Sequence, residues 1–155
     1  PAYILGTGEE ITHKDISSMP DFTKTGAIQS GQRAYAAAGL SASDVDVATL
    51  YDAFTICTLL FLEDLGFCEK GEGGSFVANG GIAPGGHFPV NTNGGGLSYC
   101  HPGMYGLLVL IEAARQIQGV CGTRQVDGAE VALAHGNGGV LSSQCTVLLG
   151  ADSTL

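Results

Sequence analysis

Reactive side chains stand beside glycine in three segments, each placed where a predicted strand ends. These are Tyr51-Asp52-Ala53-Phe54, the stretch Asn91–Gly103 with Tyr99 and His101, and His135-Gly136-Asn137-Gly138-Gly139. Imidazole and phenol groups can transfer protons, and glycine lets the backbone approach a ligand closely. In an open α/β sheet, ligands bind beyond the carboxyl ends of the strands. The sequence therefore predicts one shared pocket built from the three segments.

Each segment also has a structural alternative. Tyr51 could be a buried tyrosine whose hydroxyl is satisfied, and His135 could only orient the turn that follows it. For His101 we favour a functional role, because glycines stand near it and a predicted helix begins there. The pair in Gly6-Thr7-Gly8 lacks the third glycine of a dinucleotide-binding loop, so we expect a turn that ends the first strand.

The elements that must position these segments alternate between strand and helix patterns. Strands are predicted at Ala2–Leu5, Val45–Leu50, Phe88–Val90, Val131–Ala134 and Cys145–Leu149, with a further candidate at Ser75–Ala78. Helices are predicted at Thr25–Ala38, from a cap at Asp52 to Leu65, and at Gly103–Gln118. The last two strands are close enough in sequence to pair antiparallel. This order predicts an α/β layered fold whose mostly parallel sheet is made mixed by the final hairpin.

Composition excludes several classes of protein. The chain has 155 residues, of which 45% are hydrophobic and 14% charged, so we expect one folded domain and not a disordered segment. The formal charge of −9 is a poor match to phosphate backbones, so nucleic-acid binding is not expected. No apolar run is long enough to span a bilayer, and the first residues do not resemble a signal peptide. Five dispersed cysteines predict neither a zinc site nor a disulfide framework, which favours the cytoplasm.

The three segments together resemble the C-terminal domain of the thiolase superfamily, and the resemblance runs from the first strand to the last. Residues 51–54 take the place of the Asn-Glu-Ala-Phe or His-Asp-Cys-Phe motif. Residues 91–96 with Cys100-His101-Pro102 resemble the Asn-x-Asn-Gly-Gly…Gly-His-Pro block, and residues 135–139 fall where thiolases have Cys-x-Gly-Gly-Gly. The branch that looks closest holds the sterol-carrier or lipid-transfer-type thiolases and the thiolase-like aldolases.

The resemblance implies that residues 1–155 form one half of a duplicated αβαβα fold, with a five-stranded mixed sheet. The other half, which is not in this chain, would contain the nucleophilic cysteine. It also implies an acyl-CoA substrate and neither a metal nor a further cofactor. His101 would polarise the thioester carbonyl, and this stabilises the enolate that forms when the carbon–carbon bond breaks. Substrate contacts are expected from four further residues, Asn93, Gly95, Cys100 and Gly138.

Departures from the family pattern leave the reaction open. His135 and Ala53 stand at the two positions where thiolases have a proton-shuttling cysteine. His135 could replace that cysteine, while Tyr51 and Tyr99 are phenols of the kind that retro-aldolase members use. A phenol with a pKa of about 10 suits proton exchange with an alkoxide better than with a thiol.

The primary hypothesis is therefore the C-terminal part of an acyl-CoA acyltransferase of the acetyl-CoA acetyltransferase or 3-ketoacyl-CoA thiolase type. The alternatives are a retro-aldolase acting on a β-hydroxyacyl-CoA side chain, and a non-catalytic acyl-CoA or lipid-binding module. We expect the isolated chain to be inactive as a thiolase. The resemblance implies a homodimer for the full-length protein, and it also allows a small OB-fold, zinc-ribbon partner.

Overall fold

The computed structural model describes residues 1–155 and contains four strands and four α-helices, joined by loops and short 3-10 turns. In chain order they are β1 (Tyr3–Ile11), α1 (Ala27–Ala38), β2 (Val47–Leu50), α2 (Thr55–Asp64), α3 (Gly73–Val77), α4 (Tyr105–Ile117), β3 (Val131–Gly138) and β4 (Ser143–Gly150). The strands form one sheet in the order β1-β4-β3-β2. β2 and β3 are parallel, whereas β4 is antiparallel to both of its neighbours. The predicted mixed α/β sheet with a C-terminal antiparallel hairpin is confirmed. The expectation that the sheet would be mostly parallel is wrong, because two of its three strand pairings are antiparallel.

The prediction of five strands is wrong, because the sheet has four. The predicted strand Phe88–Val90 does lie beside β2, but it makes only an isolated parallel bridge from Val90 to Ala48. Proline has no N–H to donate to a ladder, and Pro89 occupies the middle of this segment. Asn91 then leaves the extended conformation, with φ at 51°. The fifth strand position is thus filled by a segment too irregular to pair as a strand.

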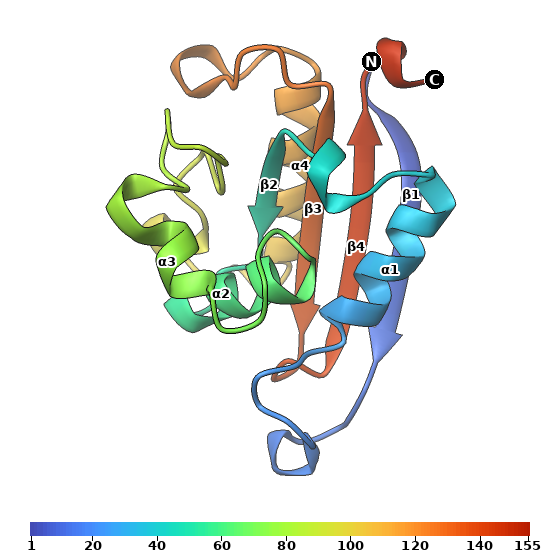
Figure 1. Ribbon diagram of the computed structural model, residues 1–155, viewed down its shortest axis with the longest axis vertical. Helices are drawn as coiled ribbons and strands as arrows, with labels where there is room; N and C mark the ends of the chain where they lie inside the picture. The colour runs from blue at the N-terminus through green and yellow to red at the C-terminus, as the bar shows by residue number, and fades with distance from the viewer.

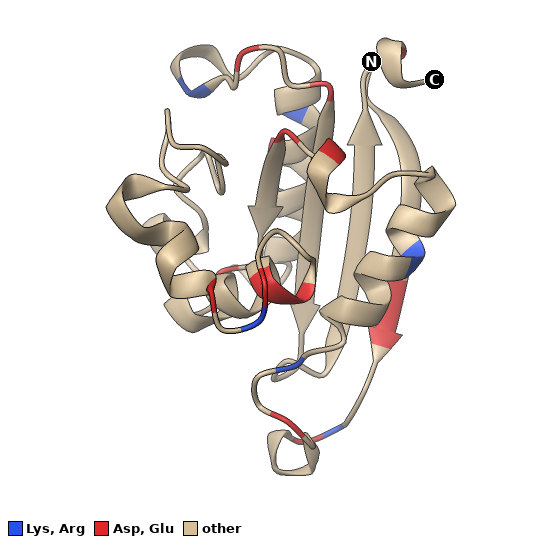
Figure 2. Ribbon diagram, viewed as in Figure 1, with Lys and Arg blue, Asp and Glu red and all other residues tan.

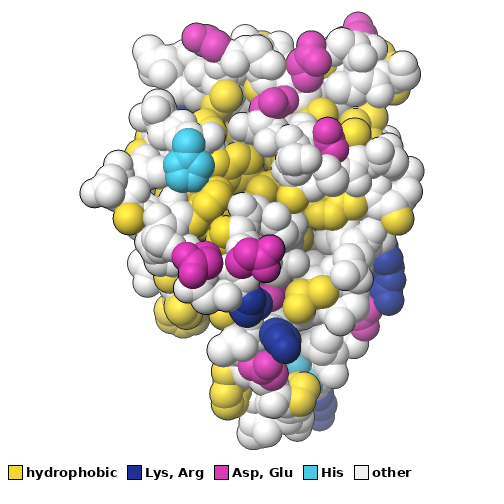
Figure 3. Space-filling model, viewed as in Figure 1, with side chains coloured by type: hydrophobic (Ala, Val, Ile, Leu, Met, Phe, Trp, Pro, Cys, Tyr) yellow, Lys and Arg dark blue, Asp and Glu magenta, His cyan; other side chains and the backbone are white.

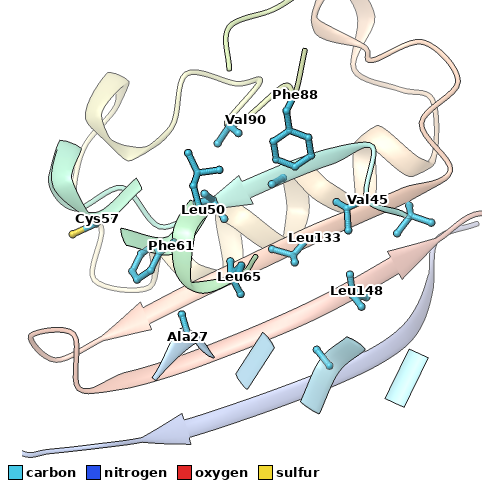
Figure 4. Packing of buried hydrophobic residues seen from close by; sticks show 14 residues of the cluster. Ala27, Val45, Leu50, Cys57, Phe61, Leu65, Phe88, Val90, Leu133 and Leu148 are labelled. Carbon is cyan, nitrogen blue, oxygen red and sulfur yellow. The ribbon is translucent and has the colours of Figure 1, made fainter. Parts of the chain in front are cut away.

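Helices cover both faces of the sheet, as Figure 1 shows. On one face, α1 and α2 pack on a hydrophobic cluster that includes Phe61, Leu133 and Leu148, which Figure 4 shows in close-up. On the other face, α4 packs on a second cluster that includes Val109 and Ala132. Adjacent strand residues point to opposite faces, so Leu133 and Ala132 belong to different layers. The arrangement is a three-layer α/β sandwich.

β1 is longer than predicted, and the expected turn at Gly6-Thr7-Gly8 is wrong. Both glycines lie inside β1, where α1 packs closely on the strand. A Cβ on Gly6 would lie 2.3 Å from the Ala34 carbonyl oxygen, and one on Gly8 would lie 2.1 Å from the Ser30 carbonyl oxygen. Real Cβ atoms do not make such contacts, so the two glycines allow close helix–sheet packing and do not form a nucleotide-binding loop.

Two further local predictions are wrong. Ser75–Ala78 is not a strand, because residues Gly73–Val77 form α3. The Gly73 N–H donates to Glu63 Oε1 at 2.9 Å, which fixes the first residue of that helix against α2. Asp52 is not the cap of α2, whose N-cap is Phe54. The carboxylate of Asp52 is used elsewhere, in the site described below.

Charged residues are dispersed over the fold, as Figure 2 shows. Four of the six cations, Lys24, Arg33, Lys70 and Arg124, form ion pairs with nearby carboxylates. Most of the positive charge is therefore neutralised locally. No helix has both the length and the apolar character that crossing a bilayer requires.

Candidate functional site

The site begins where β2 ends. The Leu50 N–H donates to Asn91 Oδ1 at 2.7 Å, so a side-chain amide supplies the bond that a fifth strand would have made. The next N–H, that of Tyr51, donates to the His135 carbonyl oxygen of β3 at 3.0 Å. Both neighbours of the strand thus fix the backbone at Tyr51. Tyr51 is buried, with only 8% of the residue exposed.

Asp52 holds the site loop, which we define as residues 91–98. Its buried carboxylate accepts hydrogen bonds from the N–H groups of Gly96 at 2.7 Å and Leu97 at 3.3 Å. Gly95 has φ at 70°, and a Cβ there would lie 2.1 Å from Asp52 Oδ2. The Gly95 N–H donates to Asn93 Oδ1 at 3.0 Å. The glycine run therefore lets the loop close around a buried carboxylate.

His101 and Tyr51 are in direct contact at the site. The Tyr51 hydroxyl lies 3.1 Å from His101 Nε2, at hydrogen-bonding distance, and the two rings meet edge to face. His101 is exposed at the cavity, whereas Tyr51 is buried. Burial, followed by the Asp52 charge, raises the pKa of the Tyr51 hydroxyl. The phenol therefore stays protonated at neutral pH, and it can exchange a proton through the imidazole.

Tyr105 is a site residue that the sequence analysis did not identify. Its ring centroid lies 5.1 Å from that of Tyr51 at an interplanar angle of 88°, and only 3% of the residue is exposed. The Tyr105 hydroxyl forms no hydrogen bond within the chain, although every fully buried polar side-chain atom has a partner. The hydroxyl must therefore reach the cavity. Burial, then the charge of Asp52, raises its pKa, so it remains a hydrogen-bond donor.

A signal for Tyr105 was present in the sequence. It is the first residue of α4 and follows His101 by four positions. Side chains in the first turn of a helix tilt toward the loop that precedes the helix. A tyrosine placed there points back at the His101 segment, and this geometry could have identified it.

These groups face a cavity at the carboxyl ends of β2 and β3. Its volume is about 520 Å³, and a smaller cavity of about 270 Å³ adjoins it. Tyr51, Ala53, His101 and Tyr105 line both. Leu107 and Leu110 of α4 and Val147 of β4 add an apolar wall to the larger one. The site can hold an apolar acyl group whose polar end reaches the phenols and the imidazole.

The predicted substrate-contacting residues lie around this region. Cys100 is exposed and lines the smaller cavity, and Gly138 lines the larger one. Asn93 and Gly95 belong to the site loop, where they support its shape. Tyr99 also lines the smaller cavity, but 63% of it is exposed. Its hydroxyl donates to the Asn93 carbonyl oxygen at 2.6 Å, so this phenol stabilises the loop.

The structure does not bring the His135 side chain to the cavity. Residues of β3 alternate between faces, and His135 points to the α1 and α2 side, where it is fully buried against Phe61. Its Nε2 lies 2.8 Å from Gln144 Oε1, and its Nδ1 lies 2.9 Å from Thr146 Oγ1. Burial lowers the pKa of His135 to about 4. The imidazole is thus neutral, fully hydrogen-bonded and separated from the site by the sheet.

A different hollow lies on the opposite side of the molecule. It has a volume of about 350 Å³ and is lined by Phe67, Phe76, His87 and Phe88 among others. Hydrophobic side chains are visible on this face between α3 and the loop before β2 (Figure 3). The hollow lacks a pair of proton-transferring groups, so it does not compete as a catalytic site. No group of three or more His, Cys, Asp or Glu side chains is arranged to hold a metal ion.

Fold and site together define an α/β protein with a pocket, at the carboxyl ends of β2 and β3, that is lined by phenol and imidazole groups. Residues 8–151 match the model of the family described as "Thiolase C-terminal domain-like". The chain belongs to this family, and the resemblance inferred from the three motifs is confirmed.

Relatives of known name include both transferases and aldolases. The chain is 35% identical to the acetyl-CoA acetyltransferase of Methanothermobacter thermautotrophicus over 141 residues, which are 90% of this chain and 37% of the relative. It is 42% identical to the steroid side-chain-cleaving aldolase of Thermomonospora curvata over 122 residues, which are 79% of this chain and 30% of the relative. The solved structure of the "Ltp2-ChsH2(DUF35) aldolase" matches with a TM-score of 0.86 and 33% identity, covering 100% of this chain and 41% of that chain. The chain thus spans less than half the length of these proteins.

Proposed function

We propose that the chain is the C-terminal part of an enzyme that makes or breaks a carbon–carbon bond next to a CoA thioester. The observation that supports this most directly is the hydrogen-bonded pair of Tyr51 and His101, with the unpartnered Tyr105 hydroxyl beside it in one cavity. One imidazole and two phenols supply donors for oxygen atoms that gain charge in the reaction. Tyr51 and Tyr105 are buried, so water has limited access to them, and this strengthens their hydrogen bonds to a charged oxygen.

Retro-aldol cleavage is the reaction that this donor set supports best. A base accepts the proton of the β-hydroxyl group, the bond between the α- and β-carbons breaks, and a ketone or aldehyde leaves. The electron pair of that bond forms the enolate of the remaining acyl-CoA. The Tyr51 phenol would relay the hydroxyl proton to the His101 imidazole, which acts as the base, and the resulting imidazolium would donate to the enolate oxygen. Protonation of the α-carbon then completes an acyl-CoA product.

Thiolysis is the second candidate, and it was the primary hypothesis from sequence. A thiolase needs a nucleophilic cysteine and a proton-carrying group. Cys145 is exposed and lines the larger cavity, but partial desolvation, followed by the charge of Glu9, raises the pKa of its thiol and lowers its reactivity. His135 faces away from the cavity. Thiolysis would therefore rely on His101 and on a cysteine from the other half of the protein.

The test is product analysis with the full-length protein, supplied separately with a β-hydroxyacyl-CoA and with a β-ketoacyl-CoA plus free CoA. Release of a ketone or aldehyde from the hydroxy substrate supports the aldolase reaction. Acyl transfer to CoA from the keto substrate alone supports thiolysis instead. Binding of both thioesters without turnover of either would favour the non-catalytic binding module.

The same proposal includes a second structural half. α4 packs on β2 and β3, while β1 and β4 are less covered on that face. Ile4 and Ile11 of β1 are 67% and 76% exposed, and Leu107 and Ile111 of α4 are also exposed. An apolar face of this kind is expected to be covered by another protein surface. We propose that the N-terminal half covers it in the full-length protein.

The isolated chain offers a direct check of that second half. We expect it to self-associate in light scattering and to be inactive with acetoacetyl-CoA and CoA. A strict monomer at high concentration, or turnover comparable to an intact thiolase, would contradict the proposal. A homodimer and a small OB-fold, zinc-ribbon partner remain part of the proposal, as does a cytoplasmic location, which the five free cysteines favour.

A further inference from the structure

Glu112 is a buried carboxylate that none of the catalytic steps above uses. It lies on α4 and is only 3% exposed. Arg124 donates to it twice, from Nε at 2.9 Å and from Nη2 at 3.1 Å. The Thr92 hydroxyl donates to the same carboxylate at 2.8 Å. Glu112 therefore joins the middle of α4 to the site loop and to the segment around Arg124.

Gln116, one turn further along α4, completes the network. Its Nε2 donates to Thr92 Oγ1 at 2.8 Å and to the Arg124 carbonyl oxygen at 2.9 Å. Burial alone would raise the pKa of Glu112, but the donors Arg124 and Thr92 outweigh it, and the pKa is lowered. The carboxylate is thus charged and fully hydrogen-bonded, and such networks hold their members in one arrangement.

Thr92 stands between two residues that shape the site. Asn91 accepts the Leu50 N–H directly before Tyr51, and Asn93 accepts the Gly95 N–H. A shift of Thr92 would move both asparagine side chains. Through Asn91 it would also move the backbone that places the Tyr51 ring against His101. A displacement of about 1 Å in a catalytic group can lower a rate by about 10²-fold.

The opposite layer contains a chemically matched cluster that does not touch the site. The Thr25 hydroxyl donates to Asp64 Oδ2 at 2.8 Å, and Lys70 pairs with the same carboxylate. Asp64 is buried like Glu112. Both clusters join a threonine, a carboxylate and a cation, but only the Thr92 cluster includes a residue of the site loop. Any effect of Thr92 on catalysis can therefore be separated from the loss of a buried hydrogen bond as such.

We propose that Thr92 and Glu112 are positioning residues, which hold the site loop so that the Tyr51 hydroxyl faces His101. The proposal rests on the proposed function, since it assigns a role within the same site. The network acts from behind the loop, and its members do not line the cavity.

The experiment compares Thr92→Val, Thr92→Ser and Thr25→Val in the full-length protein. Steady-state kinetics on a β-hydroxyacyl-CoA, the thermal midpoint and the NMR signals of the His101 imidazole are measured, with His101→Gln used to assign those signals. We expect Thr92→Val to lower kcat by about tenfold or more, with KM changed less than about threefold, and to shift the His101 signals. Thr92→Ser should restore both. Thr25→Val should lower the thermal midpoint similarly without changing kcat or the signals.

Several results would overturn the assignment. One is Thr92→Val with wild-type kcat and unshifted His101 signals; another is Thr25→Val with the same losses as Thr92→Val. If Thr92→Val does not fold, Thr92→Ala against Thr92→Ser makes the same comparison. If the wild-type protein turns over no CoA thioester, the proposed function fails, and the His101 signals alone then decide the positioning role.

Discussion

The two faces of the sheet contain similar polar side chains in opposite states. On the α4 face, His101 is exposed, and the Tyr105 hydroxyl has no partner within the chain. On the α1 and α2 face, His135 is bonded through both nitrogens to Thr146 and Gln144. Thr146 in turn lies 2.9 Å from the Ser30 hydroxyl. The difference shows that residue type alone does not decide what a side chain can do here: the groups at the candidate site keep free hydrogen-bonding capacity beside a cavity, whereas His135 is completely paired.

The largest loss of activity is expected on the α4 face, from His101→Ala in the full-length protein. The change removes both the partner of Tyr51 and the donor for the thioester oxygen. Activity on any CoA thioester substrate should fall by about 10³-fold or more. Steady-state kinetics with unchanged thermal stability is the measurement. Near-normal rates would remove the catalytic interpretation of this face altogether.

Phenol deletions should distinguish the two reactions on that same face. If the reaction is retro-aldol, Tyr51→Phe or Tyr105→Phe should cost about 10² to 10⁴ in kcat, while the retained ring keeps the packing. If it is thiolysis, each change should cost less than about tenfold. Tyr99→Phe is the matched control, because its hydroxyl bonds the loop carbonyl of Asn93. A Tyr99 loss as large as that of Tyr51 would contradict our division of the three phenols.

On the α1 and α2 face, a change in pH should alter the stability of the protein through His135, and it should not alter the reaction. The pKa of His135 is about 4 in the folded protein, below the ordinary value of about 6.5, so the unfolded state binds the proton first as pH falls. Its contribution is complete above about pH 6.5 and is lost toward about pH 4, which amounts to roughly 3 kcal/mol.

Thermal midpoints measured between about pH 7.5 and about pH 4.5 check this expectation. A His135→Gln variant should be less stable at neutral pH but should depend less on pH over that range. An equally steep pH dependence in both proteins would show that other groups dominate. Titration of the His135 NMR signals near pH 6.5 would contradict the burial argument directly.

A smaller effect should come from the glycine that lets the site loop close. Gly95→Ala adds a Cβ at 2.1 Å from Asp52 Oδ2 and strains a residue with φ at 70°. Gly128 has φ at 72° but open space around it, so Gly128→Ala tests the backbone strain alone. We expect Gly128→Ala to cost about 1 kcal/mol and Gly95→Ala about 1–2 kcal/mol more, with reduced kcat only for Gly95. Equal costs and equal kcat would show that the contact with Asp52 is unimportant.

Motifs and patterns in the sequence were enough to predict the family, the layered α/β class and the edge of the sheet where the candidate site lies. Those conclusions depend on local features: residue order within a motif, apolar periodicity, and the rule that ligands bind at the carboxyl ends of strands. Tyr51 and His101, 50 positions apart, were both identified in this way, and the structure brings them into contact.

The packed structure was needed to show which face each side chain takes and which hydroxyl stays free. Neighbouring residues of a strand point to opposite faces, so His135 enters the core although the motif resemblance placed it where thiolases have a cysteine. Tyr105 reaches the cavity because α4 begins directly behind the loop, whereas the Tyr99 hydroxyl is consumed by a backbone carbonyl. The prediction of a fifth strand failed for a similar reason, because strand pairing depends on both partners. With Pro89 and Asn91 in the neighbouring segment, β2 has only one isolated bridge on that side and one hydrogen bond to a side-chain amide. The face that a side chain takes, the strand register and the hydrogen-bond pairing all depend on residues distant in sequence. A motif specifies only the residues within it.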